Sequence, residues 1–106
     1  RLVGGITMSN LRRGVAQSAS IGYWIGAPFA RKGYMFDALR LIISYAFDNL
    51  ALNRVEAACL VHNEPSRNLL KKAGFYEEGL LRQYLCINGR WQDHICYSLL
   101  KTDPRP

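Results

Sequence analysis

The first half of the chain alternates between strand-like and helical patterns of apolar residues. Residues 1–10 and 15–25 are rich in β-branched and aromatic side chains, which favour strands, and a polar turn at residues 10–14 separates them. Residues 33–50 place apolar side chains at a helical spacing, so we expect one face of a helix to be buried. That face consists of Met35, Leu39, Ile42, Ile43, Ala46 and Leu50. An exit turn at residues 49–53 should follow, in which asparagine tolerates the left-handed conformation.

A strand and a shorter helix are predicted next. The mainly apolar run at residues 54–61 fits a buried parallel strand that the preceding helix connects to the sheet. A loop at residues 62–66 then leads into a second helix at residues 66–72. Pro65 suits a first helical turn and Gly74 suits a C-terminal cap, so these two residues set the expected ends of the helix.

Two long strands are predicted to complete the fold. Residues 75–87 and 90–100 flank Asn88-Gly89, a dipeptide typical of two-residue hairpin turns. Residues 15–25 can hold one or two strand segments; with two, the resulting order is β-β-β-α-β-α-β-β. This order predicts an α/β (α+β) fold with a mixed, mostly antiparallel sheet and two helices. The 106 residues suffice for one domain, at residues 1–100, and residues 101–106 should form a frayed tail.

The segment at residues 28–35, where the second predicted strand gives way to the first helix, is unusual in its chemistry. It carries two cations, Arg31 and Lys32, followed by Gly33. Ser, Thr, Asp and Asn normally cap a helix start, and none of them lies between Gly22 and Phe36. Because a helix start offers free N–H groups and a partial positive charge, a bound anion could replace the missing cap. We therefore expect the phosphates of a cofactor at this turn.

The net charge and the distribution of charged residues limit the kinds of partner that the chain is expected to bind. The net charge of +6 and the pI of 9.6 favour acidic partners such as nucleic acid, anionic cofactors or ribosomal surfaces. The cations are scattered, however, and the chain has no basic run and no recognisable RNA-binding motif. We therefore expect no specific nucleic-acid partner, although a basic ribosome-binding or RNA-binding module without catalysis stays open. No apolar run approaches the roughly 20 residues that cross a bilayer, so no membrane partner is expected.

The cysteines suggest neither a metal nor a disulfide framework. The three cysteines are Cys59, Cys86 and Cys96. An odd number argues against a disulfide framework, and the absence of a CxxC spacing argues against a zinc site. The predicted hairpin would pair Cys86 with Trp91 and Cys96 with Leu81, so the two cysteines would not face each other. We expect buried free thiols in a reducing cytoplasm.

Three motifs along the chain together resemble one enzyme family. They are Ile21-Gly22-Tyr23-Trp24-Ile25-Gly26, Arg31-Lys32-Gly33-Tyr34-Met35, and Asn63-Glu64-Pro65-Ser66 with Lys72-Ala73-Gly74-Phe75. Their order and spacing are similar to those of the GNAT superfamily of acetyl-CoA-dependent N-acetyltransferases, over roughly residues 2–100. The first and third motifs and the late Asn-Gly hairpin look like the RimJ/RimL branch, which acetylates the amino termini of ribosomal proteins.

The resemblance implies acetyl-CoA as cofactor and assigns residues to it. In the family, the pantetheine arm bonds the backbone of the first motif's strand, and the phosphates lie on the amides of the following loop. The matching strand residues are Trp24, Ile25 and Gly26, and the matching loop residues are Arg31, Lys32, Gly33, Tyr34 and Met35. Glycine at position 33 would let the backbone approach a phosphate without a Cβ in the way. A merely basic helix start is the simpler alternative.

Asn63 and Ser66 form the second element that the resemblance implies. In the family, the asparagine reaches the cofactor arm and the serine lies near the thioester sulfur, where a hydroxyl could act as general acid toward the leaving thiolate. The alternative is structural, with Ser66 capping its helix and Asn63 closing the turn. The tyrosine acid of many GNAT enzymes matches Leu70 here, so that mechanism is absent.

No general base is assigned. Positions that carry carboxylates in family members match Ser20 and Leu85 in this chain. Glu56 is expected to be a surface or salt-bridge residue, and Asp93 and His94 lie on the hairpin that borders the acceptor site in the family. Deprotonation of the amine through water is therefore the preferred expectation.

The chain begins at Arg1 rather than Met, which suggests a fragment or a trimmed protein. A GNAT domain usually opens with a strand and two helices that form one wall of the acceptor groove, and nothing here corresponds to them. We expect the carboxyl-terminal two-thirds of a cytoplasmic acetyltransferase, able to bind acetyl-CoA but weakly active. Its acceptor would be a protein N-terminus or another primary amine, and its uncovered apolar surface invites a homodimer. A degenerate cofactor-binding or assembly domain is the remaining alternative.

Overall fold

The protein folds around one five-stranded sheet, seen in a computed structural model that describes residues 4–25 and 33–105. The strand order is β1-β2-β3-β5-β4. All neighbouring strands are antiparallel except β2 and β3, which are parallel. The strands are β1 (Gly4–Arg12), β2 (Ser18–Ile25), β3 (Arg54–Leu60), β4 (Tyr76–Ile87) and β5 (Arg90–Leu100). The mixed, mostly antiparallel sheet predicted from the sequence is confirmed.

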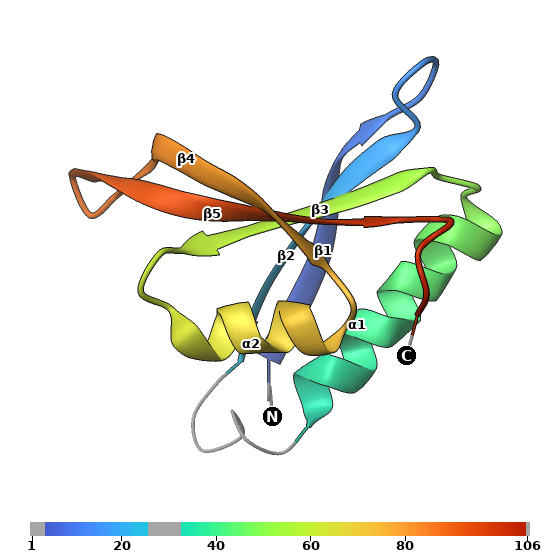
Figure 1. Ribbon diagram of the computed structural model, residues 1–106, viewed down its shortest axis with the longest axis horizontal. Helices are drawn as coiled ribbons and strands as arrows, with labels where there is room; N and C mark the ends of the chain where they lie inside the picture. The colour runs from blue at the N-terminus through green and yellow to red at the C-terminus, as the bar shows by residue number, and fades with distance from the viewer. Residues whose placement is uncertain (1–3, 26–32, 106) are drawn as a thin grey trace.

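Two helices lie on the same side of this sheet, below it in Figure 1. The first, α1 (Tyr34–Ser44), continues into a five-residue π-helical turn, η2 (Tyr45–Asn49), and α2 (Glu64–Lys72) follows β3. The predicted helix at residues 33–50 is thus confirmed to within one residue at each end, except that its last turn is π-helical. The second helix begins two residues before the predicted start, because Asn63 caps it.

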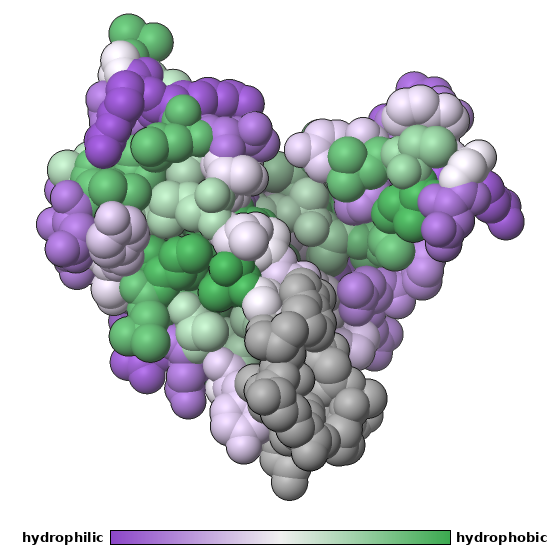
Figure 2. Space-filling view, turned by 180° about the vertical axis from the view of Figure 1, so that it is seen from behind, coloured by the Kyte–Doolittle hydropathy of each residue, from purple (hydrophilic) through white to green (hydrophobic). Residues whose placement is uncertain are grey.

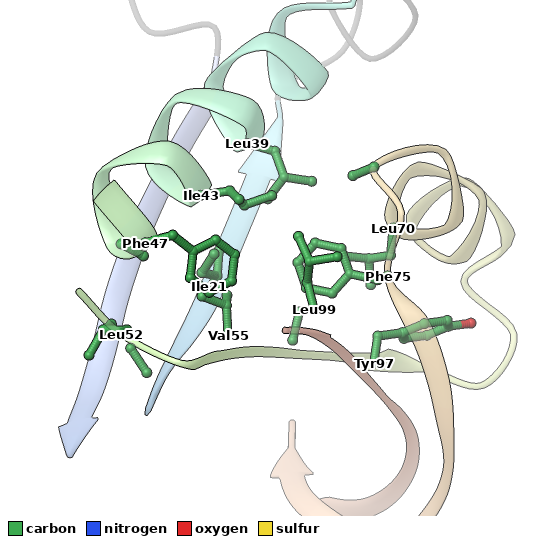
Figure 3. Packing of buried hydrophobic residues seen from close by; sticks show 14 of the residues in the cluster. Ile21, Leu39, Ile43, Phe47, Leu52, Val55, Leu70, Phe75, Tyr97 and Leu99 are labelled. Atoms are coloured by element: carbon green, nitrogen blue, oxygen red, sulfur yellow. The ribbon is translucent and has the colours of Figure 1, made fainter. Parts of the chain in front are cut away.

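The hydrophobic core fills the space between the helices and the sheet, as Figure 3 shows. Val55 pairs with Ala19 on one side and with Leu99 on the other, so the three side chains share one face of the sheet. Leu39 from α1 and Leu70 from α2 pack onto that face, and neither is exposed to solvent. One sheet face therefore holds both helices.

The π-helical turn changes which helix residues reach the core. Leu50 N donates to Tyr45 O at 3.0 Å, and this longer hydrogen-bonded loop widens the turn. Consecutive residues Ala46 and Phe47 are consequently both buried, although Phe47 was absent from the predicted face. Ile42 and Leu50, which were predicted to be buried, only pack against the edge of the cluster.

The connecting turns differ from the expected ones in detail. Strand β1 extends through Arg12, so the polar turn follows it instead of beginning at residue 10. In the exit turn, Ala51 adopts the left-handed conformation (φ 54°) that asparagine was expected to take. The end of β1 and the conformation of Ala51 depend on how the flanking elements meet, which local residue propensities do not determine.

The C-terminal segment is anchored through Arg105, so the prediction of a frayed tail is wrong for the residues the structure describes. Lys101 N donates to Asn53 O at 2.9 Å, and Leu100 N donates to Asp103 Oδ2 at 2.9 Å. Arg105 Nη2 lies 3.4 Å from Asp48 Oδ1, and its guanidinium lies over the Phe47 ring at 5.3 Å. The tail therefore packs against η2.

Extra residues in β4 shift the register of the β4–β5 hairpin, so one of the two predicted cysteine pairings is wrong. Cys86 pairs with Trp91 as predicted, but Cys96 pairs with Gly79 instead of Leu81. The irregularity between Leu81 and Leu85 produces this shift, and a second one lies beyond the pair, between Glu77 and Gly79. All three cysteines are free, but only Cys59 is buried; Cys86 is exposed.

The sheet face opposite the helices is not covered by any helix of the described residues. The two hairpins, β1–β2 and β4–β5, rise at its ends as separate lobes, and Figure 2 shows the notch between them from behind. Ser20, Glu56 and Ser98 lie side by side on this face, since they are register partners across three strands. Arg54 Nε contacts Glu56 at 2.7 Å, which confirms that Glu56 takes part in a salt bridge.

Removal of the Phe47 side chain tests the core. We expect Phe47→Ala to lower the free energy of unfolding by about 3–5 kcal/mol, because a fully buried ring leaves a cavity. Leu41→Ala is the matched control, since Leu41 is 74% exposed, and it should change the stability by less than about 0.5 kcal/mol. Urea denaturation of both variants measures the difference, and equal losses would contradict the assigned core.

Candidate functional site

The parallel strands β2 and β3 stop pairing part-way along their length. Their register contains three pairs, of which Ser20–Glu56 is the last, yet both strands continue beyond it. We call this divergence the fork: residues 21–25 of β2 and residues 57–60 of β3, which run apart toward the starts of α1 and α2 (Figure 1). Backbone N–H and C=O groups that face a missing strand partner can bind an extended ligand instead.

Two predicted cofactor residues, Trp24 and Ile25, are the last residues of β2. They pair with Gly5 and Gly4 of β1, so their strand is held on that side and open toward β3. Gly26, Arg31 and Lys32, which were predicted to bind the cofactor, lie outside the described residues. The backbone of the β2 end therefore lies at the fork, as the binding prediction requires.

The start of α1 lacks a side-chain cap, as the sequence predicts. Gly33 occupies the N-cap position with φ 77°, so the cap residue itself has no side chain that could bond the first-turn amides. Asp37 N donates to Gly33 O at 3.2 Å as the first helical bond. Tyr34 is half-exposed, whereas the Met35 side chain is buried. A Cβ added to Gly33 would meet nothing within 4 Å, so lack of space does not explain the glycine. Its left-handed backbone conformation does.

The start of α2 shows that Asn63, rather than Ser66, caps the helix. Asn63 Oδ1 accepts from Ser66 N at 3.2 Å, which is the usual bond of an N-cap. The structural alternative from the sequence assigned the cap to Ser66 and the turn to Asn63, which is wrong for Ser66 because Asn63 supplies the cap. Because the cap is supplied by another residue, the Ser66 hydroxyl is available to bond elsewhere.

Tyr23 reaches across the fork to that hydroxyl. Its phenolic oxygen hydrogen-bonds Ser66 Oγ and also lies 3.3 Å from Ser66 O. Burial raises the pKa of Tyr23, and the bond to Ser66 offsets part of that effect. Burial likewise raises the pKa of the nearby Cys59 thiol, so both groups are neutral at pH 7.

Arg67 fixes α2 to the sheet one residue after Ser66. It donates to Tyr97 Oη and to Val61 O, both at 3.0 Å, and pairs with Glu77 at 3.1 Å. Tyr97 Oη also donates to Glu77 Oε1 at 3.1 Å. The hydrogen bonds from Arg67 and Tyr97 lower the pKa of Glu77. This network holds the helix start, and therefore Ser66, in a fixed position.

The candidate bases on the β4–β5 hairpin already have structural partners. Asp93 Oδ1 accepts from Gln83 N at 2.7 Å and so closes the irregular part of β4. His94 is buried, with Nδ1 3.1 Å from Gln92 O and its ring against Tyr84. Asp93 is exposed and uses only one of its carboxylate oxygens in this hydrogen bond, so the structure does not assign a base, and water-mediated deprotonation stays a prediction.

A pocket of about 420 Å³ lies away from the fork, between α1 and the C-terminal segment. It contains none of the predicted site residues; its lining is Asp37, Arg40, Leu41, Ile43, Ser44, Ala73 and Arg105. Among the described residues, no cluster of His, Cys, Asp or Glu could hold a metal ion, and no helix is long and apolar enough to cross a membrane.

The sequence reasoning missed Tyr23 and Arg67 as parts of the site. Tyr23 lay within a recognised motif but was not assigned a role. Period-two alternation would have placed it on the core face with Ala19 and Ile21, and hence toward the helices. Arg67 follows Ser66 directly, but its three partners all lie outside α2. The residues next to it in sequence therefore do not predict its role.

Comparison with known proteins decides the family. The profile described as "Acetyltransferase (GNAT) domain" matches residues 1–76, well over half of the chain. The chain belongs to the GNAT acetyltransferase family. The fork and the uncapped start of α1 are thus features of a GNAT domain, and acetyl-CoA is the cofactor that GNAT acetyltransferases use.

Curated GNAT relatives include proteins named for ribosomal acetylation. The putative ribosomal N-acetyltransferase YdaF of Bacillus subtilis is 45% identical over 96% of this chain and 55% of its own length. The [ribosomal protein uS5]-alanine N-acetyltransferase of Escherichia coli is 36% identical over 99% of this chain and 54% of its own length. The chain therefore spans about half the length of the curated relatives it matches.

Solved GNAT structures share the fold. Ribosomal-protein-S5-alanine acetyltransferase from Vibrio fischeri has a TM-score of 0.91 at 35% identity, covering 98% of this chain and 57% of that chain. RimJ from Mycobacterium smegmatis, in complex with CoA-disulfide, has a TM-score of 0.90 at 37% identity, covering 94% and 48%. The RimJ-like resemblance proposed from the sequence motifs is confirmed.

Acid titration tests the network that anchors α2. The lowered pKa of Glu77 means that its stabilising effect is present above the ordinary glutamate pKa of about 4.3 and is lost as the pH falls through the lowered value. Glu77→Gln cannot titrate, so we expect its loss of melting temperature between pH 7 and pH 3 to be smaller than that of the parent chain. Glu64→Gln, at an exposed site on α2, is the control. An unchanged pH dependence in Glu77→Gln would contradict the network.

Proposed function

We propose that this chain binds acetyl-CoA at the fork and forms the cofactor-binding part of an N-acetyltransferase. The single observation that carries the proposal is the combination, at one end of the sheet, of an unpaired strand edge and an uncapped helix start. The strand edge suits an extended amide-containing arm, and the helix start suits phosphates. The CoA-disulfide in the RimJ neighbour supports the same assignment.

The residues fit this cofactor in both shape and charge. Gly33 has no side chain of its own at the start of α1, which suits the approach of an anion to this helix end. Arg31 and Lys32 precede it in the sequence and would add positive charge for charge-assisted hydrogen bonds. Trp24, Ile25 and Gly26 would offer backbone groups to the pantetheine arm, and Tyr34 and Met35 would contribute amides to the phosphates.

Bound acetyl-CoA supplies the acetyl group as an activated thioester. Around it, Ser66 would offer a hydroxyl proton to the sulfur as general acid. Asn63 would hold the first turn of α2 in place, since its side chain caps that turn. The acceptor amine must lose a proton during the attack, and we infer that water carries it away.

The proposed acceptor is a protein N-terminal α-amine of the ribosomal type, approached in a ternary complex. The names of the Bacillus subtilis and Escherichia coli relatives support this choice. Since ribosomal proteins are made in the cytoplasm, we propose a cytoplasmic location. A homodimer stays a prediction.

Replacement of Gly33 tests the cofactor site. Gly33→Ala should weaken acetyl-CoA binding at least tenfold, or about 1.4 kcal/mol, because a Cβ disfavours the left-handed backbone that opens α1. Gly14→Ala is a matched control: Gly14 also has a positive φ of 68° and open space around it, but lies in the β1–β2 turn. Isothermal calorimetry measures both affinities.

Both glycine variants should lose a similar amount of stability, about 1–2 kcal/mol, which separates folding from binding. Equal affinities for acetyl-CoA in the two variants would contradict the phosphate site. Thermal-shift assays with acetyl-CoA and with RNA complete the test, because a ligand that binds the folded state raises the melting temperature. Stabilisation by RNA alone would favour the nucleic-acid alternative instead.

A further inference from the structure

We infer that Tyr23 is a positioning residue that aims the Ser66 hydroxyl at the reacting sulfur across the fork. The inference rests on the proposed function, which places that sulfur near Ser66, and adds to it the residue that orients the acid. Three observations carry it: the identity of the helix cap, the place of Tyr23 on β2, and the paired contacts of its hydroxyl.

The first observation is that Ser66 is relieved of capping. A serine in the first turn of a helix commonly bonds nearby backbone groups. Here Asn63 Oδ1 already accepts from the Ser66 amide, so the hydroxyl is not needed at the helix start. The orientation of that hydroxyl among its rotamers therefore depends on side-chain partners, which are Tyr23 and the Cys59 thiol.

The second observation is that Tyr23 bonds this hydroxyl from the opposite arm of the fork. Tyr23 lies on β2 three residues beyond the last β2–β3 pair, Ser20–Glu56, and its backbone pairs with Ile6 of β1. The ring is therefore held by β1 and β2 while its hydroxyl reaches α2. The resulting hydrogen bond spans two elements separated by 43 residues in sequence.

The third observation is that the Tyr23 hydroxyl contacts both oxygens of Ser66. A phenol has one proton to donate, whereas the Ser66 carbonyl can only accept. When Tyr23 donates to the carbonyl, the serine proton points to Tyr23. When Tyr23 donates to Ser66 Oγ, the serine proton is free for another acceptor. Rotation of the two hydroxyl groups can therefore turn the serine proton away from Tyr23 without any movement of the backbone.

This rotation matters when the thioester breaks. The amine nitrogen forms a bond to the acetyl carbon, the carbon–sulfur bond breaks, and the sulfur keeps the electron pair. The Ser66 O–H then hydrogen-bonds the thiolate and keeps its proton, Tyr23 donates to Ser66 Oγ, and the surplus proton of the amine leaves to water. Hydrogen bonds to an ionised acceptor are about twice as strong as neutral ones, so the orientation of Ser66 affects the leaving group.

The groups around the pair do not titrate near neutrality. Burial raises the pKa of Tyr23 and of the Cys59 thiol on β3, and it also raises the pKa of Tyr97 on β5. Arg67 on α2 has a raised pKa and Glu77 on β4 a lowered one, so both remain charged. Between pH 7 and 8.5, the bound thiol of coenzyme A is thus the group whose ionisation should change.

The test compares coenzyme A with desulfo-coenzyme A, which lacks the sulfur, by calorimetry at pH 7 and pH 8.5. A hydrogen bond to the thiolate lowers the thiol pKa in the complex, so the affinity for coenzyme A should rise with pH. We expect at least a threefold rise for the parent chain, relative to desulfo-coenzyme A. For Tyr23→Phe, Ser66→Ala and the double variant, we expect the same smaller rise, below about 1.5-fold.

Tyr45→Phe is the control, because Tyr45 is half-exposed on η2 and lies outside the fork; it should behave like the parent chain. The affinity for desulfo-coenzyme A should be unchanged in every variant, which excludes a general structural effect. A parent-like pH dependence in Tyr23→Phe would overturn the positioning role while leaving the proposed function intact. If the parent chain binds neither ligand, the proposed function fails, and this inference fails with it.

Discussion

The short pairing of two parallel strands is the constraint on which this GNAT domain depends. Three residue pairs hold β2 to β3, and beyond Ser20 and Glu56 the strands lead to different helices. A longer pairing would satisfy more backbone groups, but it would close the stretch where β2 faces no strand of the described residues on its β3 side. The sheet remains intact because β1 secures the outer side of β2 and β5 secures the other side of β3.

The helix starts on either side of the fork are built in opposite ways. The start of α1 lacks a side-chain cap and begins at a left-handed glycine, whereas α2 has an asparagine cap and a proline in its first turn. The first arrangement provides no cap side chain, as the proposed phosphate site requires, and the second uses the asparagine as a cap and releases a serine hydroxyl. One start can therefore bind charge, while the other can present a proton.

Much of the fold could be predicted from the sequence because its signals are local. The helical period at residues 33–50, the Asn-Gly turn and the caps near Pro65 and Gly74 each depend on neighbouring residues. The missing cap before α1 was visible for the same reason. The order and spacing of the motifs then identified the family, since several weak local patterns agreed.

What escaped prediction depends on contacts between distant segments. The π-helical turn that buries Phe47, the shifted partner of Cys96 and the anchored Arg105 each reflect how elements meet in space. Tyr23 is the clearest case at the site, because its partner Ser66 is far away in sequence. Such residues carry no local signal beyond the face of the strand on which they lie.

The place of β5 in the sheet has a consequence for how the protein is made. This last strand lies between β3 and β4, and β4 joins the sheet only through it. During synthesis, β4 emerges before the strand that will hold it, so its apolar residues remain unpaired until β5 has also left the ribosome. A ribosome that stalls within β5 would therefore carry a chain with a divided sheet, and chaperones rather than the native fold would have to protect it.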